Sequence, residues 1–173
     1  MRIQFELCSH SESIFLLRRC IITDFLYDNA KHLLLSQQLN LVTAPLKMIL
    51  VSELYQPSRN QVFVNDATEN AVSLFEVSGI NYVPGFTGSG RKLLANKSLL
   101  TNSGTHKEEF HFDNISWFNL NLGLILIGGA IIIREVTDDT DSLLVMFRSN
   151  GLPVRVPGVE FRIEVDINGY FTF

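Results

Sequence analysis

The hydrophobic positions of the chain follow a helical period before Pro45 and a strand period after it. In the first part, one stripe of apolar residues recurs at the three- and four-residue spacing of an α-helix, with polar residues between. Thr23 or Asp24 is a suitable N-cap, so the pattern predicts a helix from there to about Gln38. This is the only segment with a clear helical stripe.

After Pro45, short apolar runs separated by turn residues predict strands. In "VEFRIEV", Val159 to Val165, apolar and charged residues alternate, as on a strand with one solvated face. In "HKEEFHFD", Phe110 and Phe112 share one face with His106 and Glu108, and the opposite face carries mixed charge. Further runs predicted to form strands are 46–52, 60–66, 71–79, 91–100, 107–117, 123–136 and 142–149.

Three segments predict how the strands connect. Leu122 to Ile133 is apolar on both faces, which indicates a buried central strand or a hairpin pair with a bulge or bend at Gly128-Gly129. "VTDDTDS", Val136 to Ser142, predicts a hairpin loop leading into the next strand. Asn168-Gly169 predicts a tight turn into a last short strand, Tyr170 to Phe173.

About eight strands and one early helix predict a mainly β fold, an antiparallel β-sandwich or barrel. Strands and helices do not alternate along the chain, which excludes doubly wound α/β folds. We expect one β domain with its leading helix over residues 22–173. Residues 1–21 are expected to be a separable N-terminal arm or extension.

Composition narrows the possible partners. The net charge is −4 over 173 residues, and no basic stripe is interleaved with aromatics, so no nucleic-acid partner is expected. The most apolar run, Leu122 to Ile133, is shorter than the roughly 20 residues of a membrane-spanning helix, so no membrane partner is expected. The two cysteines, Cys8 and Cys20, are too few for a metal cage or a disulfide framework.

Candidate catalytic and metal-binding groups are sparse. None of the four histidines lies in a nucleophile-elbow context, and we expect no enzyme activity, no cofactor and no metal. Glu109, His111 and Asp113 alternate on one predicted strand face and are the one row that resembles metal ligands, although a solvated face of mixed charge fits better. "DDTD", Asp138 to Asp141, lacks the ligand spacing of a calcium loop and fits a solvated hairpin tip.

The stretch Gly85 to Lys92 resembles a phosphate-binding loop at first sight. Gly85 and Gly90 have the glycine spacing of a Walker A motif, but Arg91 stands at its lysine position and Lys92 at its hydroxyl position. A strand, not a helix, is predicted to follow, so no helix N-terminus is available for a phosphate. We therefore interpret the stretch as a contact loop.

Several phrases occur in a fixed order along residues 22–173. They are "DFLYDNAKHLLLSQQLNL", "LKMILVSELYQPSRN", "FEVSGINYVPG", "GSGRKLLANKSL", "FDNISWFNLNLG", "GGAIIIREVTDDTDSLLVMF" and "INGYFTF". This order resembles small virion structural proteins of tailed bacteriophages, in which a short helix precedes an antiparallel β domain. Two features depart from the family: residues 1–21 precede its usual start, and "LGLILIGGAIII" is more apolar, which would mark a subunit interface wherever it is exposed.

The resemblance implies a non-enzymatic virion protein, with a capsid decoration (cement) protein that bridges subunits favoured. A tail, fibre-base or head–tail adaptor subunit is the alternative, as is a host-surface carbohydrate-binding module using Tyr82, Phe86 and Trp117. The expected partners are the major capsid protein or other virion subunits. The chain is expected to form a homo-oligomer such as a trimer. Its expected location is the phage head surface, or the tail, after synthesis in the bacterial cytoplasm. The candidate interface residues, in the glycine-rich loop, the hairpin tip and the loop Asn150 to Pro157, are Gly85, Phe86, Gly88, Gly90, Arg91, Lys92, Asp138, Asp139, Asp141, Leu152 and Arg155.

Overall fold

The computed structural model describes residues 24–166 and 169–172, and this part of the chain is mainly β. It contains two short helices and nine strands, all paired antiparallel. The elements are β1 (Phe25–Leu26), α1 (Asp28–Leu35), β2 (Leu46–Ser52), α2 (Val72–Phe75), β3 (Lys92–Leu93), β4 (Ser98–Asn102), β5 (Lys107–His111), β6 (Ile115–Arg134), β7 (Leu143–Arg148), β8 (Val154–Ile163) and β9 (Phe171–Thr172).

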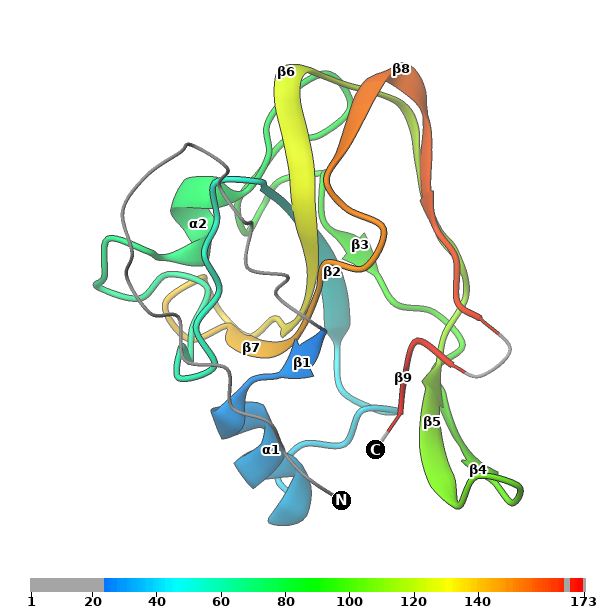
Figure 1. The fold of residues 1–173 in the computed structure, drawn as a ribbon. Helices are drawn as coiled ribbons and strands as arrows, with labels where there is room; N and C mark the ends of the chain where they lie inside the picture. Colours follow the sequence, from blue (N-terminus) through cyan, green and yellow to red (C-terminus); the bar gives the residue numbers. More distant parts are fainter. Residues whose placement is uncertain (1–23, 167–168, 173) are drawn as a thin grey trace, which may run out of the picture.

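The strands form two sheets. The larger sheet has the order β1-β7-β6-β2-β3, with β8 paired to the other half of β6, and the smaller sheet has the order β4-β5-β9. Figure 1 shows β6 running up through the molecule and bending over at the top together with β8, while α1 and the β4–β5 hairpin lie at the opposite end. The mainly β, antiparallel prediction is confirmed. Within the described residues neither sheet closes into a barrel.

The core lies around β2, β6 and β7. Met48 to Val51 in β2 and Leu144 to Phe147 in β7 are buried without interruption, so both faces of the sheet are covered there. Ala130 to Ile133 of β6 lies between them and is buried in the same way. Consecutive apolar residues in these runs are therefore explained by burial on two sides.

Several predictions from the sequence are confirmed. The strand predicted at 46–52 is β2, and the predicted loop 136–142 joins the antiparallel strands β6 and β7. Leu122 to Ile133 belongs to one strand, not to a hairpin pair. Its register against β2 shifts so that Gly128 has no partner, and a Cβ there would lie 2.3 Å from Glu53 Cα. Gly128 is thus the predicted bulge, placed where the two backbones approach closely.

The helical prediction was too long at both ends, since the helix ends at Leu35 and not near Gln38. Phe25 and Leu26 pair with Phe147 and Met146 as β1, and the helix begins at Asp28. Phe25, Leu26 and Tyr27 are all buried, which a helix with a single apolar stripe cannot achieve for three consecutive residues. The pairing of Phe25 and Leu26 with the edge of β7 therefore outweighed the helical pattern of the local sequence.

Other predicted strands were wrong or were divided. Within 60–66 only Phe63 forms a β-bridge, and 71–79 contains the short helix α2. The run 91–100 splits into β3 and β4, and the predicted loop Asn150 to Pro157 already enters β8 at Val154. The last strand pairs with β5 and not with its neighbour β8. Asn168 and the arm 1–21, with Cys8 and Cys20, lie outside the described residues.

Candidate functional site

A buried ion-pair cluster joins the glycine-rich loop to the hairpin tip. The Arg91 side chain is 0% exposed and lies between the carboxylates of Glu76 and Asp139. Its Nε and Nη2 donate to Glu76 Oε1 and Oε2 at 3.0 and 2.7 Å, and its Nη1 and Nη2 donate to Asp139 Oδ1 and Oδ2 at 2.5 and 2.8 Å. Two bidentate pairs fix one guanidinium by geometry as well as by charge. We call these three side chains the Arg91 cluster.

Two further charged residues, Glu135 and Lys47, connect the Arg91 cluster to β2. Glu135 Oε1 lies 3.7 Å from Arg91 Nη1, and Glu135 also pairs with Lys47. Burial alone would lower the pKa of Arg91, but the hydrogen bonds to Glu76 and Asp139 outweigh it and raise that pKa above its ordinary value. The Arg91 guanidinium therefore keeps its positive charge, and these ion pairs link β2, the segment after α2, the glycine-rich loop and the β6–β7 loop.

Tyr82 extends the cluster into the core. Its hydroxyl accepts a hydrogen bond from the Leu50 amide at 3.0 Å and donates to Glu76 Oε1 at 3.2 Å. Burial, followed by the negative charge of Glu76, raises the pKa of Tyr82 well above its ordinary value. The phenol is thus a permanently neutral bridge between β2 and the Arg91 cluster.

We expect Tyr82→Phe to lower the free energy of unfolding by about 1–3 kcal/mol, because it leaves the buried Leu50 amide without a partner. Urea unfolding at neutral pH measures the change. Tyr170→Phe is the matched control, because the buried Tyr170 hydroxyl has no hydrogen-bond partner among the described residues. Equal losses in the two variants would contradict the bridging role of Tyr82.

The glycine-rich loop does not present its amides as a phosphate site would. The N–H groups of Gly85, Gly88 and Gly90 donate to Glu76 Oε2, the Gly85 carbonyl and the Val83 carbonyl, respectively. A Cβ at Gly90 would lie 2.4 Å from the Tyr82 ring, and the Gly90 carbonyl accepts the Trp117 indole N–H at 2.6 Å. The loop is folded tightly onto the core, and the strand β3 follows it directly.

The prediction that Arg91 is a surface contact was wrong, because its guanidinium is buried by two carboxylates. Gly90 is also buried. Gly85, Phe86, Gly88 and Lys92 are half-buried. Sequence reasoning missed Glu76 as the principal partner of Arg91. The sequence offered one signal that Arg91 needs a partner. An arginine follows three glycines, and an acidic loop, Asp138 to Asp141, occurs later in the chain.

The hairpin tip is held by its own side chains. Asp141 Oδ1 accepts the amides of Thr137 and Asp138 at 3.0 and 2.9 Å, and Asp138 Oδ1 accepts the Thr140 amide at 2.6 Å. Asp139, which pairs with Arg91, and Asp141 are half-buried, so Asp138 is the one exposed residue of the three predicted contact carboxylates. These contacts explain the acidic residues without a calcium ion.

We expect Thr137→Ala to raise the pKa of Asp141. The Thr137 hydroxyl is the largest of the hydrogen bonds that hold this pKa below its ordinary value, ahead of the Asp138 amide. A depressed carboxyl pKa contributes stability above the unfolded-state pKa that is lost as the pH falls through the folded-state value. An NMR titration of the Asp141 carboxyl measures the shift, with Thr140→Ala as the control. An unchanged Asp141 titration in Thr137→Ala would contradict the assignment.

The proposed metal row does not assemble. Glu109 is buried, and its carboxylate accepts from Asn102 Nδ2 at 2.7 Å and lies 3.4 Å from His111 Nε2. Asp113 instead accepts from Asn96 Nδ2 at 2.7 Å. Within residues 24–166 and 169–172, no group of three or more His, Cys, Asp or Glu side chains could hold a metal ion. Burial of Glu109 also corrects the expectation of a fully solvated face.

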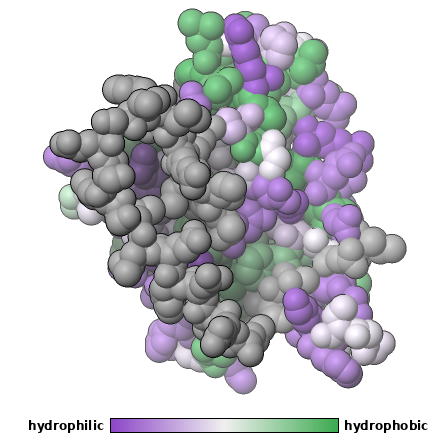
Figure 2. Space-filling model, in the orientation of Figure 1, coloured by the Kyte–Doolittle hydropathy of each residue, from purple (hydrophilic) through white to green (hydrophobic). Residues whose placement is uncertain are grey.

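A cluster of exposed apolar side chains lies where β6 bends. Leu124 is 83% exposed, Leu54 70%, Leu74 67% and Ile125 40%, and they border a groove of about 350 Å³ that also contacts Phe75. We call these four side chains and their groove the apolar end. Figure 2 shows apolar side chains gathered at the top of the molecule, above the bend. The prediction that Leu122 to Ile133 is buried throughout was therefore wrong at Leu124 and Ile125.

A bulge in β6 explains this exposure. Asn121 pairs with Pro157 and Leu126 with Arg155, so four residues of β6 oppose Val156 alone. Gly123 takes φ +63°, and its amide donates to Asn121 Oδ1 at 2.9 Å. The Gly123 carbonyl accepts the Arg155 Nε–H at 3.1 Å. The extra residues are thereby turned outward and held there.

The remaining candidate residues are separated. Arg155 is exposed beside the bulge, whereas Leu152 lines a different pocket next to Tyr170. Trp117 and Tyr82 are buried, so neither offers the stacking surface that a carbohydrate module needs. Phe86 is half-buried. The predicted set is thus not one continuous surface.

Comparisons with protein-family models, with curated proteins and with solved structures found no match to this chain. In the described part of the structure, neither helix has the length and apolarity to cross a bilayer.

Proposed function

We propose that the chain is a non-enzymatic structural subunit of a tailed-phage virion, most concretely a capsid decoration protein, that docks through its apolar end. The observation that carries the proposal is the exposure of Leu124 near the middle of β6, a strand whose residues Ala130 to Ile133 lie in the core. Within the described residues, a bulge holds this large apolar side chain in water. Burial against a neighbouring subunit would remove it from water.

The apolar end has the features of a small docking site. Leu54 and Leu74 flank a groove, and Leu124 projects beside it, so a partner side chain can enter the groove while Leu124 enters a pocket on the partner. The described groove lining includes Glu53 and Glu76 but no Lys or Arg, and the Glu76 carboxylate is 1% exposed and bound to Arg91. The matching surface on the major capsid protein is therefore expected to be mainly apolar.

Rigidity supports the same function. The Arg91 cluster fixes the segment after α2, which lines the groove through Glu76 and Val77. The bulge fixes the other wall through Leu124 to Leu126. A preformed site loses little conformational entropy on binding, which suits a protein that reinforces a shell by spanning its subunits.

A tail, fibre-base or head–tail adaptor subunit would use the same end with a different partner. The carbohydrate-binding alternative has less support, because two of its three candidate aromatics are buried.

The proposal is tested by mass spectrometry and quantitative gel analysis of purified virions from the phage that encodes this sequence. We expect the chain in many copies per particle. Purified protein should also bind again to particles assembled without it. Absence of the chain from intact virions would refute the structural role, and a few copies confined to isolated tails would refute the decoration role while retaining the tail alternative.

A further inference from the structure

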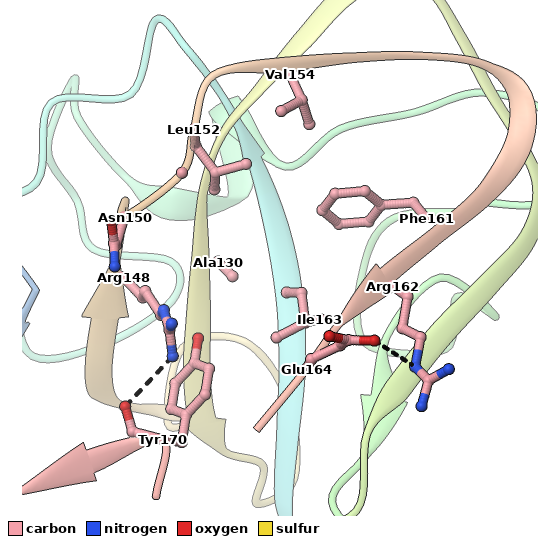
Figure 3. A pocket seen from close by; sticks show the side chains of 11 residues that line it. Ala130, Arg148, Asn150, Leu152, Val154, Phe161, Arg162, Ile163, Glu164 and Tyr170 are labelled. Atoms are coloured by element: carbon pink, nitrogen blue, oxygen red, sulfur yellow. Dashed lines mark hydrogen bonds and ion pairs between the residues drawn. The ribbon is translucent and has the colours of Figure 1, made fainter. Parts of the chain in front are cut away.

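A second pocket is bordered by β8, the segment from Arg148 to Leu152, and Tyr170. It encloses about 290 Å³ beside Tyr170, with Ala130 and the apolar side chains of Leu152, Val154, Phe161 and Ile163 among its lining residues. Its polar lining residues are Arg148, Tyr170, Asn150, Arg162 and Glu164, which Figure 3 labels, and Glu164 pairs with Arg162 at 3.6 Å. The volume is at the lower end of the range for small-molecule sites.

The Tyr170 hydroxyl is the unusual group in this pocket. The residue is 5% exposed, and its hydroxyl makes no hydrogen bond within the described residues. Figure 3 shows the hydroxyl pointing toward Ala130, on the pocket side of the ring. The Arg148 guanidinium lies 4.4 Å from the ring centroid, but arginine has only donors and cannot accept the hydroxyl proton. Among the described residues, the Tyr170 hydroxyl therefore has no hydrogen-bond acceptor, although a cation lies beside its ring.

Long contacts hold the Arg148 guanidinium in place. Its Nη1 donates to the Tyr170 carbonyl at 3.4 Å, and its Nε lies 3.6 Å from Asp24 Oδ2. Asp24 is itself bound to the Ser149 and Asn150 amides through Oδ1, which holds it at the edge of the site. A guanidinium with such long contacts can still bind an anionic oxygen placed next to the Tyr170 hydroxyl.

We propose that this pocket binds a small aliphatic monocarboxylate. One carboxylate oxygen accepts the Tyr170 hydroxyl proton, the other faces Arg148, and the hydrocarbon tail lies against Leu152 and Phe161. The carboxylate supplies the acceptor that the Tyr170 hydroxyl lacks among the described residues, and the tail matches the apolar wall. This inference is independent of the proposed virion role and of the apolar end.

Titration with hexanoate, followed by amide NMR shifts, tests the site, and the lone Trp117 gives a second signal because its ring lies 5.8 Å from Phe161. We expect saturable shifts at Leu152, Phe161 and Tyr170. Hexanamide, which lacks the charge, should bind about tenfold more weakly. Arg148→Met should weaken hexanoate binding by about tenfold or more, whereas Arg155→Met, a matched change at an exposed arginine of β8, should leave it unchanged.

Tyr170→Phe keeps the ring and removes only the hydroxyl. We expect it to weaken hexanoate binding and to leave the stability of the free protein unchanged or raised, because an unpaired buried polar group is removed. If hexanoate causes no saturable shifts, or if it binds equally to wild type, Arg148→Met and Tyr170→Phe, the proposal is overturned. A destabilised Tyr170→Phe without hexanoate binding would assign the pocket to a structural water instead.

Discussion

Arg91→Ala is expected to lower the free energy of unfolding by about 3–5 kcal/mol, the largest stability loss we predict for a single side chain here. The substitution leaves the buried Glu76 carboxylate, 1% exposed, and the half-buried Asp139 carboxylate, 16% exposed, without their cation. Glu135 also loses its 3.7 Å contact with the Arg91 guanidinium. Removing one partner of a buried ion pair costs the desolvation of the charges that remain.

Chemical unfolding followed by Trp117 fluorescence measures this loss, because the indole N–H is bonded to the carbonyl of the adjacent Gly90. Arg91→Lys should recover part of the stability, since it restores the charge but not the two bidentate pairs. Arg162→Ala is the control, because Arg162 is 47% exposed and its contact with Glu164 is 3.6 Å long, so less than about 1 kcal/mol is at stake. A change in Arg91→Ala as small as in the control would show that the Arg91 cluster does not stabilise the fold.

Leu124→Asp is expected to abolish most of the binding to the proposed virion partner while leaving the fold intact. Leu124 is 83% exposed, so a carboxylate at this position remains solvated in the free protein. In the docked state the same carboxylate would be buried in an apolar site without a partner. Central hot-spot residues contribute about 2 kcal/mol or more, which corresponds to at least roughly thirtyfold weaker binding.

Binding of purified variants to particles assembled without this chain measures the effect. Leu35→Asp is the matched control, since Leu35 is 86% exposed on α1 and Figure 1 places α1 at the end of the molecule opposite the bend in β6. We expect wild-type binding for Leu35→Asp. Equal binding of Leu124→Asp and wild type would exclude the apolar end as the docking surface.

Sequence patterns predicted the strands whose burial is uniform and missed the segments whose structure depends on a partner. β2 was predicted with its observed bounds because seven consecutive residues suit a central strand. The region 71–79 resembles a strand in composition, yet Val72–Phe75 forms a helical turn whose Ser73 amide donates to the Val64 carbonyl. Such a contact between separated segments leaves no periodic trace in the sequence.

The same distinction applies to the candidate sites. The sequence identified both the loop before Arg91 and the acidic tip with Asp139, but not that the two residues pair across 48 positions of the chain. It predicted that any exposed part of "LGLILIGGAIII" would be an interface, a prediction that awaits the binding experiment. The exposure itself depends on the register shift between Asn121 and Leu126, which only the pairing with β8 reveals. Tyr170 carried no signal, because an unpaired hydroxyl is a property of packing.

The central claim is that Leu124 and the apolar end are buried against another virion subunit. Cryo-electron microscopy of the intact virion tests this most directly, because the bent β6–β8 end and the opposite α1 end differ enough to orient the chain in a map. We predict density for this fold on the outer face of the head, with Leu54, Leu74 and Leu124 in contact with the capsid protein. A map in which the chain is present but its bent end faces solvent would contradict the account.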